Sequence, residues 1–327
     1  MSMARQARRL WTVVLGSFIV GLAVNPILAV SAQPSIGQEH EETSAIDCRY
    51  HARVEGDQGA AGSSSALALP NDDVFRPLLA DPKQPQFFAT YQAVRVRQNN
   101  TAVNIGSVGF GDNFGLYSKR HGCNGWQVGI LGGVFSQFNL DAPSTDLLNT
   151  DFVIGIPVSW RSGLVSLRAR LYHQSSHLGD ELLLGNPQLK RENLSFEEAE
   201  ALLSIDAPGG WGRMYAGGGY LLHRTPDLKP AKVQLGVELR GPTMRSLLLG
   251  ETFGTLRVTP VIGADFKSFE ELSWTVNSNV VAGLEWSRST GTRRLRLLLN
   301  YYKGFTPYGQ FFAQKTETFG AGVYLTF

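Results

Sequence analysis

The sequence predicts an all-β protein, a transmembrane antiparallel β-barrel of about 12 strands. Two observations support this fold class. From Gln86 onward, segments of roughly 10 to 14 residues alternate apolar and polar side chains, and turn residues separate these segments. The chain also ends on such a segment, TFGAGVYLTF, whose last residue is the aromatic Phe327. A period of two indicates strands that have one apolar face.

The alternation is clearest at residues 232–240 and 293–302. In the first segment Val233, Leu235, Val237 and Leu239 share one face, opposite Lys232, Gln234, Gly236, Glu238 and Arg240. In the second, Leu295 and Leu297 oppose Arg294 and Arg296. Strands are expected at 86–97, 102–115, 125–138, 148–160, 163–177, 193–206, 211–223, 231–240, 255–267, 273–288, 292–304 and 316–327. The stretch SFEEAEALLSI in the sixth has a helical composition, so a helix competes there.

A soluble sandwich or barrel buries its apolar faces, whereas a transmembrane barrel turns them toward lipid and keeps a polar interior. Four features favour the membrane. The segments have the length that a tilted strand needs to cross a bilayer. Their polar faces are rich in Arg, Lys, Glu and Gly. The chain begins with an export signal, and its end resembles the C-terminal signal of bacterial outer-membrane β-barrels.

Residues 1–32 read as a signal peptide that directs export to the bacterial outer membrane. Arg5, Arg8 and Arg9 precede an apolar run, and small residues end at Ala32. A transmembrane anchor is the alternative, although Asn25-Pro26 interrupts the run. We expect a periplasmic N-terminal extension over 33–85 and the barrel over 86–327.

Topology alternates short periplasmic turns with longer outer connections, except for a long periplasmic connection at 241–254. Cys48 and Cys123 then both fall on the periplasmic side, and we predict a disulfide between them; two free thiols are the alternative. Tryptophans fall at the strand ends, in the pattern of an aromatic girdle. They are Trp126, Trp160, Trp211 and Trp286 at periplasmic ends and Trp274 at an outer end.

Charge and motif content exclude several function classes. The formal net charge is +2 and falls to −1 once the three arginines of residues 1–32 are removed, so nucleic-acid binding is not expected. The glycines at 106, 109, 111 and 115 lie in an alternating strand with no following helix, so no nucleotide site is expected. The expected partner is outer-membrane lipid. The sequence leaves the oligomeric state open.

By parity, arginines and acids share the barrel interior. These are Arg95, Arg97, Arg168, Arg170, Arg240, Arg294 and Arg296, facing Glu238, Glu285 and Asp265. A barrel of this size is narrow, so ion pairs of this kind would fill the lumen. We favour this closed interior over an anion-selective pore.

The segment RSGLVSLRARLYHQSSHLGDE, residues 161–181, carries the candidate chemistry. Parity puts His173, Ser175 and His177 on the lipid side, near the outer end of the fifth strand. The Cβ atoms of His173 and Ser175 would lie roughly 6–7 Å apart. His173 could then deprotonate Ser175 for nucleophilic attack. Alternatively, the three side chains sit in the headgroup zone with no chemical role.

His173-Gln174-Ser175 resembles the His-x-Ser core of outer-membrane phospholipase A, a family of barrels of about twelve strands. In that family the core is His-x-Ser-Asn-Gly, and an Asn on the next strand orients the His; here Ser176-His177 replaces Asn-Gly. The resemblance implies Asn193 as the orienting residue, although its offset differs. The loop carboxylates imply a possible calcium site, and His177, Asp180 and Glu181 are the candidate metal ligands.

Over about residues 74–327 the chain resembles the bacterial family called domain of unknown function 1207. The resemblance rests on the stretches FRPLLADPKQPQF, GFGDNFGL, GWQVGILGGVFSQF, LLNTDFVIGIPVSWRSG, SLRARLYHQSSHLGDE and GQFF. It implies an outer-membrane barrel and no particular activity. Three functions stay open: a barrel of undefined role, a lipolytic enzyme of phospholipase or lipid A deacylase type, and a small-solute channel.

Overall fold

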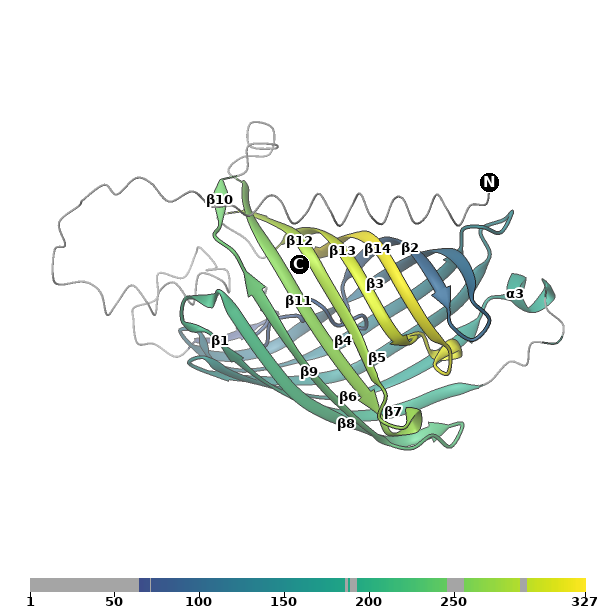
Figure 1. Ribbon diagram of the computed structural model, residues 1–327. Coiled ribbons are helices and arrows are strands. Elements are labelled where there is room, and N and C mark those ends of the chain that lie inside the picture. Colours follow the sequence, from purple (N-terminus) through teal and green to yellow (C-terminus); the bar gives the residue numbers. More distant parts are fainter. Residues whose placement is uncertain (1–64, 71, 186–187, 189–192, 246–255, 289–292) are drawn as a thin grey trace, which may run out of the picture. The chain divides into compact units, whose positions relative to one another are not determined.

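The computed structural model describes residues 65–327, except 71, 186–187, 189–192, 246–255 and 289–292 (Figure 1). The predicted signal peptide, residues 1–32, lies outside the described residues. Twelve long strands of the described part form a closed antiparallel barrel. They are β2 (Phe87–Val96), β3 (Thr101–His121), β4 (Asn124–Asn139), β5 (Leu147–Ser162), β6 (Val165–Leu178), β7 (Leu194–Asp206), β8 (Gly212–Thr225), β9 (Ala231–Arg240), β11 (Leu256–Phe269), β12 (Val276–Arg288), β13 (Arg294–Phe305) and β14 (Lys315–Thr326).

Each barrel strand pairs with its neighbours in the chain, and β14 pairs with β2 to close the sheet. The twelve segments expected from the sequence correspond one to one with these strands, so the fold class is confirmed. Two short strands are additional: β1 (Ser65–Ala68) pairs with β3, and β10 (Met244–Arg245) pairs with β11. No helix among the described residues is long and apolar enough to cross a membrane.

The segment with a helical composition, β7, is a strand. Its inward residues explain this outcome, because Glu198 and Glu200 form ion pairs with Lys232 of β9. Its outward residues, Leu203 and Ile205, join the apolar exterior. Contacts of this kind outweigh the weak intrinsic helix preference of Glu, Ala and Leu.

The two faces of the wall have opposite chemistry. Outward side chains are large and apolar; Ile154 is 62% exposed, Leu235 53% and Leu297 52%. Inward side chains such as Arg168 and Gln234 are buried and polar. A soluble barrel would show the reverse. The molecule is therefore an outer-membrane-type barrel, and its exterior carries the exposed tryptophans Trp126, Trp160, Trp211 and Trp274 near the strand ends.

Connections at the two ends of the barrel differ in length. At one end, here called the turn end, β3–β4 and β5–β6 are joined through residues 122–123 and 163–164, where Gly122 (φ 59°) and Gly163 (φ 58°) adopt the left-handed conformation. At the other, the loop end, lie 140–146, 179–193 and 306–314. The helix α3 (Asp180–Gly185) belongs to the second of these connections.

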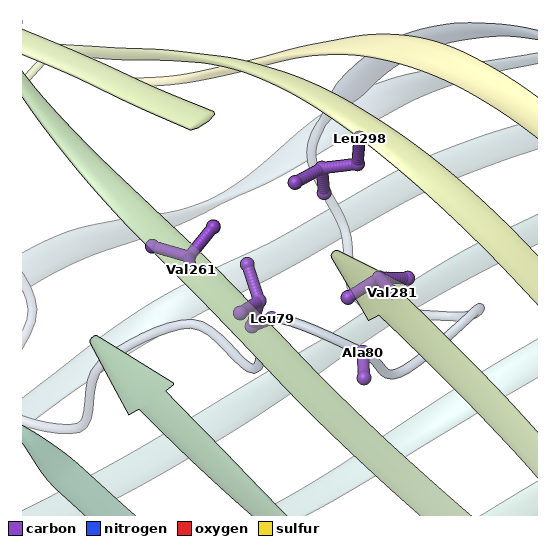
Figure 2. Packing of buried hydrophobic residues seen from close by; sticks show 5 residues of the cluster. All are labelled: Leu79, Ala80, Val261, Val281 and Leu298. Atoms are coloured by element: carbon purple, nitrogen blue, oxygen red, sulfur yellow. The ribbon is translucent and has the colours of Figure 1, made fainter. Parts of the chain in front are cut away.

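Residues 72–86, here called the luminal segment, pass through the barrel interior. The sequence predicts a periplasmic extension up to residue 85, whereas this part of it packs against inward-facing side chains of the barrel. Phe75 and Leu78 cluster with Leu202 and Tyr215. A second cluster contains Leu79, Ala80, Val261, Val281 and Leu298, and Figure 2 shows the two residues of the segment beside the three wall residues. Residues 33–64 lie outside the described part.

Charged groups tie the luminal segment to the wall. Arg76 pairs with Asp206, Lys83 with Asp151, and Asp81 with Lys267. Backbone groups add to these contacts: the amide of Leu79 donates to Glu238 at 2.7 Å, and the Ala80 carbonyl accepts from Asn279 at 2.6 Å. Buried charges need such partners, because an unpaired buried charge costs several kcal/mol.

Inward-facing arginines form two further clusters with acids. Glu285 contacts Arg240 at 2.9 Å, Arg294 at 3.1 Å and Arg296 at 2.7 Å. Glu200 contacts Arg168 at 3.1 Å and Arg170 at 2.7 Å. These ion pairs agree with the expected salt-bridged interior.

Two arginines were assigned to the wrong face. Arg95 and Arg97 point outward, because the inward residues of β2 are the even-numbered ones. Arg97 pairs there with Glu317 of β14 at 2.6 Å. The predicted disulfide joins Cys48 and Cys123. Cys123 is disulfide-bonded in the structure, and Cys48 lies outside the described residues.

Candidate active site on the outward face

The residues singled out on β6 divide between its two faces. Tyr172, Gln174 and Ser176 are buried inside the barrel. His173, Ser175 and His177 alternate with them and point outward, as parity predicts. The three lie in the part of β6 nearest the loop end, beyond the exposed Leu171 of the apolar band.

His173 has a partner on the neighbouring strand. The antiparallel register of β6 and β7 sets His173 directly opposite Glu197. The Nδ1 of His173 lies 2.8 Å from Oε1 of Glu197, and the two side chains are 40% and 42% exposed. Because a carboxylate only accepts, Nδ1 carries the proton of this hydrogen bond and Nε2 is left as the basic nitrogen.

Asn193 does not occupy this position. The last β6–β7 pair is Ser176 with Leu194, so Asn193 lies beyond the ladder, and Ser195 is the residue opposite Ser175. The sequence alone does not predict Glu197 as a site residue. Its place opposite His173 depends on the register between β6 and β7, which a long connection separates in the chain. The available signal was parity: residues 193, 195 and 197 all share the outward face.

Ser175 lies beside His173 on the same face of β6. Within the described part of the chain, no hydrogen bond engages the Ser175 hydroxyl. The Nε2 of His173 could therefore take the Ser175 proton through a rotation of the two side chains. A serine, a histidine and a carboxylate that fixes the histidine are the three residue types of a nucleophilic triad.

Apolar side chains surround the pair. Across β5, Ile154 is the register partner of His173 and Phe152 that of Ser175. Both are exposed on the outside, Phe152 at 46%. The candidate triad is therefore at the edge of the apolar band.

The proposed metal ligands are not gathered. His177 contacts the ring of Phe152 edge to face, with centroids 5.8 Å apart. Asp180 and Glu181 are in the first turn of α3 and are exposed. Among the described residues there is no group of three or more His, Cys, Asp and Glu side chains that could hold a metal ion.

Solved structures share this barrel. The outer membrane phospholipase A from Escherichia coli is 14% identical, with a TM-score of 0.51 over 77% of this chain and 93% of that chain. The Salmonella typhi outer membrane phospholipase dimer with bound calcium is 15% identical, with a TM-score of 0.52 over 77% and 94%. An active-site mutant of the Escherichia coli enzyme, with an asparagine changed to alanine, is 13% identical, with a TM-score of 0.51 over 87% and 98%. At these identities the likeness concerns the fold.

The comparison with curated proteins gave no match. A family model described as "Protein of unknown function (DUF1207)" matches residues 30–327, which include every strand of the barrel. The chain therefore belongs to the DUF1207 family of outer-membrane-type β-barrels.

Proposed function

We propose that this barrel is a lipid ester hydrolase of the bacterial outer membrane, exported by its N-terminal signal peptide. Ser175 is the nucleophile, His173 the general base, and Glu197 the residue that positions His173. The observation that carries the proposal is the 2.8 Å hydrogen bond between His173 Nδ1 and Glu197 Oε1 beside Ser175 on the outward face.

The chemistry is acyl transfer. His173 Nε2 removes the proton of the Ser175 hydroxyl while Oγ attacks the carbonyl carbon of an ester, and the imidazolium then protonates the departing alcohol. Water releases the acyl group from Ser175 in a second round that uses the same base. Glu197 holds the ring and stabilises its charged form.

The position of the triad selects the substrate class. It faces lipid near the loop end, which is the outer side in the expected topology. The candidate substrates are phospholipids and the acyl esters of lipid A. The fold shared with the phospholipases supports this assignment, since those barrels act on lipid of the same membrane type.

Whether the proposed hydrolysis requires calcium is a separate question. The Salmonella phospholipase dimer holds bound calcium, whereas the described residues of one chain here offer no group of acidic and histidine ligands for it. No step above passes through a metal ion. Reactions with added calcium and with chelator establish whether this enzyme differs from that protein.

The experiment measures fatty-acid release from phospholipid and from lipid A by the full chain in mixed micelles. Ser175→Ala is expected to abolish release, and Ser195→Ala, on the opposite strand and the same face, to leave it unchanged. Release that survives Ser175→Ala overturns the proposal. His173 and Ser175 would then only contact the polar headgroups of the lipid.

A small-solute channel is the less favoured function. The luminal segment and its ion pairs occupy the interior that a pore would need. Planar-bilayer conductance checks this directly, and a steady current through the wild-type protein would restore the channel.

A further inference from the structure

The barrel interior retains a cavity of about 320 Å³ toward the loop end. Residues 79–82 of the luminal segment contribute to its lining, together with side chains of β2, β13 and β14. Tyr308 and Phe311 of the β13–β14 connection and Leu182 of α3 line it as well. A volume of this size lies in the range of small-molecule sites, about 300–1,000 Å³. We propose that this cavity binds a small, uncharged, polyhydroxylated ligand, a mono- or disaccharide.

The lining chemistry argues for a neutral ligand. Among the described residues that line the cavity, Asp81 is the one with a formal charge, and Lys267 already pairs with it. The other polar groups are amides and hydroxyls, among them Gln92, Asn139 and Thr318. Each amide offers both donors and an acceptor, as the hydroxyl groups of a sugar require.

Aromatic rings supply the complementary surface. Phe88, Tyr302, Tyr308, Phe311 and Tyr324 line the cavity beside the amides. The faces of a sugar ring consist of C–H groups and its rim consists of hydroxyls. Such a molecule matches a wall that mixes rings with amides, whereas an acyl chain would leave the amides without partners.

One buried acceptor in this wall has no partner. Asn300 is 7% exposed, and its Oδ1 accepts no hydrogen bond from the described residues. Its orientation is fixed, because Nδ2 donates to Oδ1 of Asn279 at 2.5 Å and Asn279 in turn donates to the Ala80 carbonyl at 2.6 Å. Unpaired buried oxygens are uncommon in folded proteins, so this acceptor is available to a ligand hydroxyl.

Charged and apolar ligands fit less well. An anion would approach Asp81 and find no unpaired cation among the described lining residues. An apolar ligand would leave Asn300 Oδ1 unsatisfied. Ordered water could also fill the space, because several polar groups converge there. Water as the sole occupant is therefore the competing outcome that the experiment must separate.

The test is calorimetric titration of the full chain in a zwitterionic detergent that contains no sugar. Glucose and maltose are the probes, and glucuronate and glucosamine are the charged controls. We expect saturable binding of at least one neutral sugar and at least tenfold weaker binding of both charged ones. No saturable binding of either neutral sugar, or equal binding of the charged ones, overturns the proposal and leaves water as the occupant.

A matched pair of variants at the apolar Val94 locates the binding site. Val94 is buried between Val103 and Thr318 in the strand register, and both neighbours line the cavity. Val94→Thr preserves the volume and should bind within about threefold of the wild type, whereas Val94→Phe fills the space and should bind at least tenfold more weakly. Equal binding by both variants places the sugar elsewhere.

Asn300→Leu tests the unpartnered acceptor and should weaken binding about tenfold, the size of one lost hydrogen bond. Folding of each variant is checked by its strand circular dichroism and heat-modified gel mobility. Ser175→Ala should bind sugar like the wild type, so a failure of the hydrolase proposal leaves this one standing.

Discussion

His173 and Glu197 face each other across β6 and β7 on the outside of the barrel, with Nδ1 and Oε1 2.8 Å apart. These two polar side chains satisfy each other directly on a surface that consists mainly of large apolar residues. Ser175 lies two residues along β6 from His173, on the same face. A serine, a histidine and a carboxylate therefore share the outward face near the loop end.

Glu197→Ala should reduce acyl release about a hundredfold, mainly in kcat, because the ring of His173 loses the group that holds it. Glu197→Gln should recover part of the rate, since an amide oxygen still accepts from Nδ1. Asn193→Ala, beyond the β6–β7 ladder, should match the wild type. Steady-state kinetics on micellar phospholipid measure the three; a normal kcat in Glu197→Ala would remove Glu197 from the site.

The strands were predictable because their signal is local. Alternation at 232–240 identifies β9 without any knowledge of its neighbours, and parity along β6 placed His173 and Ser175 on the outside. Parity predicts the face of a residue less reliably over a short segment, because an error of one residue reverses the assignment. Such an error placed Arg95 and Arg97 in the lumen.

Long-range features were not predictable in this way. Glu197 becomes the partner of His173 through register across residues 179–193, and no local pattern fixes register over a connection of that length. The luminal segment has no periodicity of its own. Phe75 and Leu78 are buried because the closed barrel surrounds them. The local sequence of residues 71–85 does not predict this burial.

Leu78→Ala should lower the free energy of unfolding by about 2–5 kcal/mol, the usual effect of removing a large side chain from a packed core. Leu78 is fully buried against Phe75, Leu202 and Tyr215. Leu184→Ala is the control, because Leu184 on α3 is 83% exposed, and it should change stability by less than about 0.5 kcal/mol. Urea titration of protein refolded in vesicles compares the two; equal effects would mean that the luminal segment does not stabilise the barrel.

Glu285→Gln should destabilise the barrel by about 3–5 kcal/mol, because Glu285 is buried and three inward-facing arginines lose their shared counter-charge. They are Arg240, Arg294 and Arg296. Glu317→Gln removes an acid from an exposed pair with Arg97 and should cost less than about 1 kcal/mol. The same unfolding measurement tests both substitutions, and a small effect at Glu285 would indicate that water screens the lumen.

The luminal segment should also make stability depend on pH. Burial raises the pKa of Asp73 from 3.8 to about 7, against opposing hydrogen bonds from Asn113 and Gln127. Between these two values the folded protein holds a proton that the unfolded chain has released. The free energy of unfolding therefore falls as the pH rises from about 4 to 7.

Asp73→Asn should flatten this slope, since the amide does not titrate. Asp141→Asn is an informative control, because hydrogen bonds from Asn104 lower the pKa of Asp141 in an exposed loop. Its carboxylate adds stability above its unfolded pKa and loses it as the pH falls, which is the opposite sign. Unfolding midpoints measured from pH 2 to 8 separate the two variants, because the Asp73 contribution changes between about pH 4 and 7 and the Asp141 contribution changes below about pH 4. An unchanged slope in Asp73→Asn would show that Asp73 is ionised and solvated at neutral pH.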